Sequence, residues 1–511
     1  MTGSLRALLE AGVANAPDKV MISADGAELT WSRLHDQACR VAAALVRDGV
    51  KPQDRVIYLG KNDPRYFEVL FGCALAGAVL TPLNWRLAAD ELAAIIEDAQ
   101  ATVAFVDSSV VPVVKSRLKA IVALGPHESW TQYAQWRGPA DDPGVRPQPE
   151  HIAFQLYTSG TTGRPKGAMF ANGSNLRVLL DGISVEWGFT ADDVSLVALP
   201  LFHMGGLAWA LAGLARGARC VVVRDFDPAG VLNTIEAEGV SVAFFVPAML
   251  SAVCAAAAAG TRKLGLVRVF YSGAPISPVA LTRAMTVLRC DFIQIYGLTE
   301  ATGAFAQLPA HEHDPNGPLA HLLLSAGRPY PWVEIRVVST SGTGDVPLGD
   351  IGEIWTRSEQ NLVGYWNDAE QTAKALTPDG WLRTGDLGRV DAEGRIFLVD
   401  RAKDLVISGG ENVYPVEVEN VLAAHPQLAE FAVIGVPHER WGETVKAIVV
   451  PRPGAEISQD EVIGFVRQRL AAFKCPTSVD IATTLPRTAT GKVLKHVLRE
   501  PYWRGYDRRI N

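Results

Sequence analysis

The stretch YTSGTTGRPKG, Tyr157–Gly167, carries three glycines, several hydroxyl side chains and a lysine within eleven residues. It follows an apolar run, which predicts a loop at the end of a buried strand. Backbone N–H groups, hydroxyls and a lysine charge together favour phosphate as the ligand. The spacing excludes a Walker A loop, because Gly160 and Gly163 lie too close together and no hydroxyl residue follows Lys166. The alternative, a polar surface loop, is disfavoured by the density of hydroxyls after a buried strand.

Composition and charge indicate a folded protein of more than one domain. The chain has 511 residues, more than one hydrophobic core usually serves, so we expect two or more domains. Hydrophobic residues make up 48% and charged residues 20%, a mixture typical of globular proteins. The net charge of −7 gives no reason to expect a nucleic-acid partner.

The cysteines and the apolar segments indicate the compartment. The six cysteines show neither zinc spacing nor a disulfide framework, so we expect a reducing cytoplasm. The N-terminal MTGSLRALLEAGVANAP is amphipathic and does not resemble a signal peptide. The most apolar run, Ala243–Ala259, contains Pro247 and is mostly alanine. It favours a strand followed by a buried helix over a transmembrane segment.

Short apolar runs alternate with helical patterns before residue 400. We expect strands at Val56–Gly60, Thr102–Asp107 and Ala120–Gly125, with an amphipathic helix at Leu87–Ala99. This alternation predicts an α/β fold with a large N-terminal domain of parallel or mixed sheets layered with helices. The polar run Arg137–Val145 is interpreted as a loop between subdomains.

Four later apolar runs each end in small, polar or aromatic residues. They are IAFQLYTSG, VSLVALPLFH, VRVFYSGAP and DFIQIYGLTE. Ligands of open parallel sheets bind beyond the carboxyl ends of the strands. The four ends therefore predict one shared ligand site.

The pattern changes after residue 380. Leu387–Arg401 predicts a hairpin that turns at Asp391–Gly394. The following residues predict a small α+β domain, with the boundary near Asp400–Lys403. We therefore expect an N-terminal domain at 1–400 and a small mobile C-terminal domain at 401–511. The expected C-terminal elements are a helix at Pro415–Ala424, strands at Phe431–Val436 and Val445–Val450, and a helix at Asp460–Ala472.

Further motifs, together with the opening stretch, resemble those of the adenylate-forming superfamily, which includes acyl-CoA synthetases, aryl-CoA ligases, luciferases and peptide-synthetase adenylation domains. They occur in the expected order, and their residues are most similar to those of bacterial acyl-CoA synthetases and 4-coumarate-type ligases. The resemblance implies that a carboxylate attacks the α-phosphate of ATP, giving an acyl-adenylate and pyrophosphate, and that coenzyme A then takes the acyl group and releases AMP. The motifs are PLFHMGG, YSGAP, YGLTE, GYW, DGWLRTGD, DRAKDLVISGGENVYPVEVE, WGE and LPRTATGKVLKHVLR.

The resemblance also implies which residues bind the nucleotide. Thr158 and Glu300 would hold Mg²⁺, a cation that prefers oxygen ligands. Thr299 would contact the α-phosphate, Asp386 the ribose hydroxyls, and Arg401 the ribose or a phosphate. Tyr296 is expected to stack on adenine, with packing in the core as the alternative. The remaining expected ATP and AMP contacts are Ser159, Gly160, Thr161, Thr162, Lys166, Gly273, Ala274, Pro275, Gln294, Gly297 and Lys492.

Lys492 is the expected catalytic lysine of the small domain. The sequence predicts that Thr490 caps and Gly491 starts a helix, with the lysine away from its apolar face. The resemblance implies that Lys492 bridges the carboxylate and the α-phosphate during adenylation. It also implies a hinge at Lys403, about which the small domain rotates between the two steps. The expected channel for coenzyme A is lined by Ser408, Gly409, Gly410 and Trp441.

The acyl pocket is expected around His203, Val246 and Ser272. Taken alone, His203 could be a hydrogen-bonded core residue, but the resemblance implies that it binds the carboxylate or gates the pocket. The Gly- and Ala-rich segment after His203 either leaves an acyl tunnel open or allows close helix packing, and Trp209 could shorten such a tunnel. The expected catalytic set is Lys492, His203, Thr299 and Glu300.

Several alternatives remain open at this point. The acceptor could be an amine or a carrier-protein thiol, and the chain could be a nucleotide-binding relative without turnover. The acid itself, expected to be fatty or otherwise hydrophobic, and the oligomeric state are not specified by the motifs. No transmembrane segment is expected. Peripheral membrane contact through Arg499–Arg509 competes with the simpler interpretation of a solvated helix end.

Overall fold

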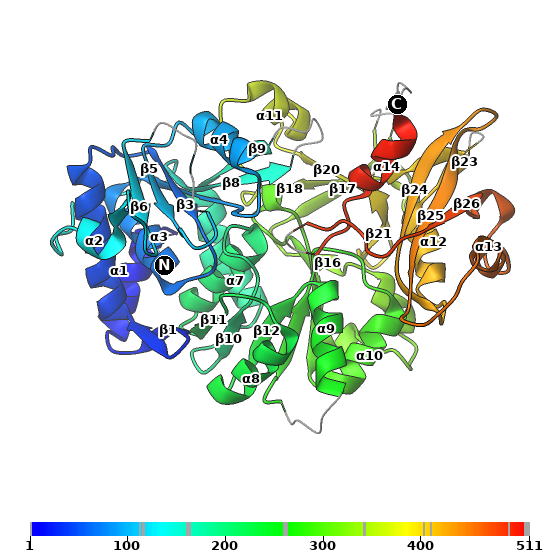
Figure 1. Ribbon diagram of the computed structural model, residues 1–511, viewed down its shortest axis with the longest axis horizontal. Helices are drawn as coiled ribbons and strands as arrows, with labels where there is room; N and C mark the ends of the chain where they lie inside the picture. Colours follow the sequence, from blue (N-terminus) through cyan, green and yellow to red (C-terminus); the bar gives the residue numbers. More distant parts are fainter. Residues whose placement is uncertain are drawn as a thin grey trace.

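The computed structural model describes residues 3–504, except 112–113, 115–117, 160–164, 259–263, 341–343, 402–403, 409–410 and 489–490, and the side chains of residues 159 and 401. Within this range the chain forms a large N-terminal part of layered sheets and helices and a smaller C-terminal part (Figure 1). The α/β fold expected from the sequence is confirmed.

The first large sheet has the strand order β19-β9-β8-β4-β3-β5-β6-β7 within the described residues. Its central strands β8, β4, β3, β5 and β6 are parallel, whereas β9 pairs with β8 and β19 in antiparallel fashion. The strands expected around residues 56, 102 and 120 are confirmed. The bounds are β3 Arg55–Leu59, β4 Val79–Leu83, β5 Val103–Val106, β6 Ala120–Ala123, β7 Thr131–Gln132, β8 Ile152–Ser159, β9 Pro165–Ala171 and β19 Gly364–Tyr365.

The second large sheet has the order β16-β15-β14-β13-β12-β10-β11-β1-β2. Strands β10 to β14 are parallel, which brings their carboxyl ends to one edge. The strand and helix expected at Ala243–Ala259 are present as β12 and α9. The bounds are β1 Val20–Ala24, β2 Ala27–Thr30, β10 Val194–Val197, β11 Arg219–Val222, β12 Val242–Phe245, β13 Arg268–Tyr271, β14 Asp291–Tyr296, β15 Ala306–Leu308 and β16 Arg328–Pro329.

Helices fill the space between these two sheets and cover their outer faces. Along β3, Val56 and Tyr58 face the inner core while Ile57 and Leu59 face α4, as the two-residue period of a strand requires. The inner core includes α1, α2, α3 and α7, and a separate core packs α8, α9 and α10 on the second sheet. The bounds are α1 Leu5–Asn15, α2 Trp31–Arg47, α3 Pro64–Ala76, α4 Ala89–Asp98, α5 Tyr133–Trp136, α6 Ser184–Glu186, α7 Met204–Ala215, α8 Pro228–Glu238, α9 Pro247–Ala258, α10 Pro278–Leu288 and α11 Ala369–Ala375.

The interpretation of Arg137–Val145 as a loop between subdomains is wrong. Strand β7 before it and strand β8 after it belong to the same sheet, so the loop returns the chain across that sheet. The guanidinium of Arg6 in α1 binds both Asp142 and the Val145 carbonyl, which ties the loop to the helix layer. The polar composition of this segment correctly indicated a loop, but it did not indicate a boundary between subdomains.

A smaller antiparallel sheet, β17-β18-β20-β21, leads toward the C-terminal part. Strands β20 and β21 form the hairpin expected at Leu387–Arg401. The C-terminal sheet, β23-β22-β25-β24 with β26 beside β25, lies at one end of the molecule (Figure 1). The bounds are β17 Glu334–Val338, β18 Gly352–Arg357, β20 Leu382–Val390, β21 Ile396–Arg401, β22 Val406–Ser408, β23 Glu411–Val413, α12 Pro415–Leu422, β24 Leu428–His438, β25 Gly442–Pro451, α13 Gln459–Arg467, β26 Ser478–Ile481 and α14 Lys495–Trp503.

Candidate active site

The predicted magnesium residues meet where the two large sheets approach each other. Thr158 lies near the end of β8 and Glu300 in a short 3-10 turn, η3 (Thr299–Ala301), just after β14. The Thr158 hydroxyl donates to Glu300 Oε1 over 3.2 Å. Hydroxyl and carboxylate oxygens suit Mg²⁺, which proteins bind through one or two carboxylates together with substrate phosphates. The pair therefore fits a Mg²⁺–nucleotide site.

Only part of the glycine-rich loop lies within the described residues. Thr158 pairs directly with Lys166 across the antiparallel ladder of β8 and β9. The Lys166 ammonium donates to the side chain of Gln371 in α11 and lies 5.2 Å from the centre of the Tyr365 ring. The other predicted phosphate residues, Gly160, Thr161, Thr162 and the side chain of Ser159, lie outside the described part.

The turn that carries Glu300 is closely packed. A side chain at Gly297 would place its Cβ 2.0 Å from the Gly303 carbonyl oxygen, so only glycine fits there. Thr302 has a left-handed φ of 54°. The Leu362 N–H donates to the Glu300 carbonyl over 2.7 Å. Backbone geometry thus sets the direction in which the Glu300 side chain leaves the chain.

A buried polar network lies behind this turn. The Asn175 amide donates to the Thr302 hydroxyl and to the carbonyls of Gln360 and Asn361. Asn175 belongs to η1 (Asn172–Leu176), the first of two π-helical segments, the second being η2 (Val178–Ile183). Such segments are rare and occur frequently at functional sites. Motif reading did not single out Asn175 or Gln360.

Further predicted ATP and AMP contacts lie at the carboxyl ends of β13 and β14. Gly273 and Pro275 are exposed and Ala274 is partly exposed, which leaves this segment accessible to a ligand. Gln294 pairs in register with Tyr271, whose hydroxyl donates to Gln294 Oε1 over 3.3 Å. The Tyr271 oxygen also lies 2.9 Å from Nε2 of the buried His313.

Tyr296 shows the core packing that was the alternative expectation for it, while stacking on adenine stays a prediction. Its ring is buried in the inner core, edge-on to Phe305 at 4.6 Å between centroids. Its hydroxyl donates to Asp386 Oδ2 over 2.8 Å, so the predicted adenine and ribose residues are in contact. Asp386 in turn pairs directly with Arg401 across the hairpin of β20 and β21. Thr299 is partly exposed at the start of η3.

His203 lies where β10 leads into α7. It occupies the N-cap position of α7, and its backbone carbonyl accepts the Leu207 N–H. Desolvation, helped by the positive charge of Arg86, lowers the pKa of His203 to about 4. The imidazole is therefore neutral near pH 7, a form in which one ring nitrogen can donate a hydrogen bond and the other can accept one.

The segment after His203 packs closely. A Cβ at Gly206 would lie 2.3 Å from the Pro200 carbonyl oxygen. Trp209 is buried among aromatic rings, with Phe244 and Phe270 at 5.5 and 5.1 Å, and its indole N–H donates to the Leu196 carbonyl. These contacts favour close helix packing over an open tunnel along α7.

Val246, a predicted acyl-pocket residue, lies between the nucleotide side and the lysine side. A Cβ at Gly273 would be 3.2 Å from Val246 Cγ1, and one at Gly491 would be 3.9 Å from Cγ2. The same Gly491 position would be 3.3 Å from the Cβ of Ala248 in α9. The segment next to Lys492 therefore rests on the N-terminal part beside the predicted pocket. Ser272 follows β13 and is partly exposed.

The prediction that Gly491 starts a helix is wrong. Helix α14 begins at Lys495, and Lys492 is exposed in a tight turn before it. Gly491 has a φ of 80°, which a right-handed helix excludes, and the Lys492 N–H donates to the Thr488 hydroxyl. The Thr488 N–H donates to the Lys492 carbonyl and closes the turn. The expected cap, Thr490, lies outside the described residues.

The predicted hinge and channel residues are only partly visible. Lys403, Gly409 and Gly410 lie outside the described residues. Ser408 is buried at the end of β22. Trp441 is 39% exposed, and its ring stacks on His438 at 4.4 Å and 13°.

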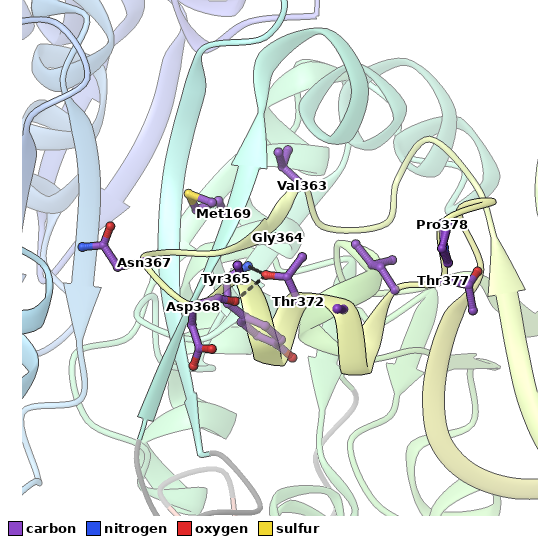
Figure 2. A pocket seen from close by; sticks show the side chains of 12 residues that line it. Met169, Val363, Gly364, Tyr365, Asn367, Asp368, Thr372, Thr377 and Pro378 are labelled. Atoms are coloured by element: carbon purple, nitrogen blue, oxygen red, sulfur yellow. Dashed lines mark hydrogen bonds between the residues drawn. The ribbon is translucent and has the colours of Figure 1, made fainter.

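A cavity of about 710 Å³ opens between β9, β19 and α11 (Figure 2). Met169, Val363 and Thr372 contribute to its lining. Tyr365 lines it as well, while its hydroxyl donates to Glu300 Oε1 over 2.9 Å. The cavity therefore lies next to the predicted phosphate site, although Glu300 and Lys166 are not among its lining residues.

Comparison with known proteins identifies the family. The AMP-binding enzyme family matches residues 9–366, and the AMP-binding enzyme C-terminal domain matches residues 417–492. The chain therefore belongs to the AMP-binding, or adenylate-forming, enzyme family, a family of ATP-dependent ligases that includes coenzyme A and acyl-carrier-protein ligases. The resemblance read from the motifs is confirmed.

The relatives differ in substrate and acceptor. The chain is 39% identical to a fatty acid–[acyl-carrier-protein] ligase, ScoC, of Streptomyces coeruleorubidus, over 97% of this chain and 96% of the relative. It is 38% identical to a feruloyl-CoA synthase of Amycolatopsis, over 95% and 96%. The ATP-bound crystal structure of MatB from Rhodopseudomonas palustris superposes with a TM-score of 0.86 at 30% identity, over 99% of this chain and 100% of MatB.

Among the described residues, no helix combines the length and apolarity needed to span a membrane.

Proposed function

We propose that the protein is an AMP-forming acid–thiol ligase that converts a hydrophobic carboxylic acid, such as a fatty acid, into its coenzyme A thioester. The observation that carries the proposal is the contact of Thr158 with Glu300, next to Lys166 on the neighbouring strand and with Tyr296 bonded to Asp386 close by. In this arrangement one nucleotide would contact three kinds of group. Thr158 and Glu300 offer oxygen ligands for its cation, Lys166 a charge for its phosphates, and Asp386 a carboxylate for its ribose hydroxyls.

In the first step, a carboxylate oxygen attacks the α-phosphorus of ATP, and the bond to the bridging oxygen of pyrophosphate breaks. Lys166 and the glycine-rich loop hold the β- and γ-phosphates, and Asp386 accepts hydrogen bonds from the ribose. Mg²⁺, bound by Thr158 and Glu300, would neutralise charge on the phosphates. Lys492 bridges the carboxylate and the α-phosphate and so stabilises the charge that develops between them.

In the second step, the thiol sulfur of coenzyme A attacks the acyl carbon, its proton leaves, and AMP departs with the electrons of the acyl–oxygen bond. We propose that the unit 401–511 rotates about Lys403 and removes Lys492 before this step. In the described arrangement the Asp400 carboxylate accepts the Val416 N–H at the start of α12 over 3.0 Å. This bond joins the end of β21 to the small unit, so the rotation would break it. Ser408, Gly409, Gly410 and Trp441 would then line the thiol channel.

Acid-dependent exchange of pyrophosphate into ATP tests the first step. A panel of fatty, aryl and short-chain acids should include at least one that supports exchange in the presence of Mg²⁺. Absence of exchange with every acid would overturn the proposal.

Lys492→Ala tests whether Lys492 acts in the adenylation step and not in the transfer step. It should lower the rate of adenylation by about 100-fold or more, since it removes a charge that stabilises the transition state. Transfer of the acyl group from synthetic acyl-adenylate to coenzyme A should remain largely intact. The exposed Lys51 provides the matched control, and Lys51→Ala should behave as the unchanged protein. Equal losses in both half-reactions for Lys492→Ala would contradict the rotation.

A carrier-protein thiol is the second candidate acceptor, because ScoC is an acyl-carrier-protein ligase. Offering coenzyme A and a phosphopantetheinyl carrier protein separately, each with the preferred acid, distinguishes the two. Faster thioester formation on the carrier protein would replace coenzyme A as the acceptor and leave the adenylation step as proposed.

A further inference from the structure

The segment from Gln360 to Tyr365 holds the Glu300 turn at several points. The Gln360 amide donates to the carbonyls of Ala301 and Ala304, both over 2.7 Å. The Leu362 N–H donates to the Glu300 carbonyl. These bonds fix the backbone of the turn. The Tyr365 hydroxyl, 2.9 Å from Glu300 Oε1, is the part of this segment that contacts the carboxylate itself.

Tyr365 is itself held firmly. Its backbone pairs with Ala168 of β9, and its N–H donates to the Thr372 hydroxyl of α11 over 2.9 Å (Figure 2). Its side chain is 8% exposed. A tyrosine hydroxyl has one hydrogen to donate, and here it is directed at the carboxylate of Glu300.

Two hydroxyls converge on the same oxygen of Glu300. Thr158 reaches Oε1 from β8 and Tyr365 reaches it from β19, on opposite sides of β9 in the same sheet. A carboxylate bonded in this way has little freedom to rotate, while Oε2 keeps its acceptor capacity for another partner. Partners of this kind around a metal-binding side chain orient that side chain for its ion.

We propose that Tyr365 is a positioning residue for Glu300, which it fixes in the one orientation that receives Mg²⁺·ATP. This inference rests on the proposed function. It gives a role to Tyr365 of the GYW motif, for which the sequence predicted no role.

A tyrosine with the same chemistry elsewhere in the chain provides a matched control. The Tyr133 hydroxyl donates to Glu68 Oε2 over 2.6 Å, and Tyr133 is also buried. This pair lies between α5 and α3, away from the nucleotide residues. Tyr365→Phe and Tyr133→Phe therefore remove the same hydroxyl–carboxylate bond, one in the proposed site and one outside it.

The experiment measures nucleotide binding by calorimetry on the full-length protein, with ATP in Mg²⁺ and with ATP in excess EDTA. Tyr365→Phe should weaken the binding of Mg²⁺·ATP by about tenfold or more, the usual effect of removing such a partner. It should leave the binding of ATP in EDTA within about twofold, and raise the Mg²⁺ concentration for half-maximal pyrophosphate exchange. Tyr133→Phe should match the unchanged protein in all three measurements, and thermal unfolding of both variants would report any loss of fold.

Three outcomes would overturn the inference. Binding of Mg²⁺·ATP by Tyr365→Phe at unchanged affinity would show that Glu300 needs no such bond. Equal weakening with and without Mg²⁺, or equal weakening in Tyr133→Phe, would assign the tyrosine to general packing. If the unchanged protein binds no ATP, the proposed function fails as well, and that result is distinct from a loss confined to Tyr365→Phe.

Discussion

Replacement of Asn175 by alanine should strongly destabilise the protein. Asn175 is fully buried, and its Oδ1 accepts the Ala171 N–H over 2.9 Å. Its amide donates to the Thr302 hydroxyl and to the carbonyls of Gln360 and Asn361 over 3.0, 2.8 and 2.9 Å. The Thr302 hydroxyl also donates to the Gln360 carbonyl, so that carbonyl keeps a donor in the variant.

The expected loss follows from two buried backbone groups that lose their bond to Asn175, the Ala171 N–H and the Asn361 carbonyl. A buried polar group left unbonded costs roughly 1–3 kcal/mol, so two of them reduce the free energy of unfolding by about 4 kcal/mol. That is a large share of the roughly 5–15 kcal/mol by which proteins are usually stable.

Urea unfolding followed by tryptophan fluorescence measures this loss, since the Trp332 indole donates to Gln360 Oε1 and belongs to the network. Ser251→Ala, at an exposed position of α9, is the control and should change stability by less than about 0.5 kcal/mol. Because the network also holds Thr302, Asn175→Ala should slow pyrophosphate exchange below its melting temperature. A loss of less than about 1 kcal/mol would refute the assignment of these bonds.

Three further predictions concern a histidine, a glycine and an aspartate. Burial lowers the pKa of His313 to about 4, below its ordinary 6.5, so the unfolded chain binds the proton more readily and stability falls as pH drops through that window. His313→Gln should reduce this fall by on the order of 3 kcal/mol in urea unfolding at pH 7 and pH 4, and an unchanged pH dependence would count against it. Gly297→Ala, whose Cβ would meet the Gly303 carbonyl, should cost about 1–3 kcal/mol of stability and most of the exchange activity; wild-type exchange would contradict the close packing. Asp386→Asn should raise KM for ATP about tenfold and reduce discrimination against 2′-deoxy-ATP, and unchanged discrimination would remove Asp386 from the ribose site.

Local signals predicted the elements well where pattern and packing agree. The helix at Ala89–Asp98 buries Leu92, Ile95 and Ile96, as its periodicity indicated. The hairpin of β20 and β21 turns at Asp391–Gly394, as predicted. The predicted helix start near Lys492 is wrong. Gly491 adopts a left-handed conformation and Thr488 bonds to Lys492, and together these outweigh the local helix propensity. Such hydrogen bonds depend on the folded backbone geometry, which the local sequence pattern does not specify.

The motifs predicted which residues belong to the site, but most of the contacts between those residues could not be predicted from the sequence. Thr158 and Glu300 are 142 positions apart, and only the family pattern suggested that they meet. Asn175 and Tyr365 carry no local sign of their contacts, because each acts on a turn far away in sequence. The π-helical segment η1 is only five residues long, too short to show an apolar period of its own, so it could not have been foreseen.

Val246 has a consequence for how such an enzyme can evolve. Its two methyl groups face Gly273 on one side and Gly491 on the other. A Cβ at Gly273 would lie 3.2 Å from Val246, which is tighter than ordinary contact, whereas the 3.9 Å on the Gly491 side is not. A lineage that replaces Gly273 must therefore also make room at Val246, so we expect these two positions to change together.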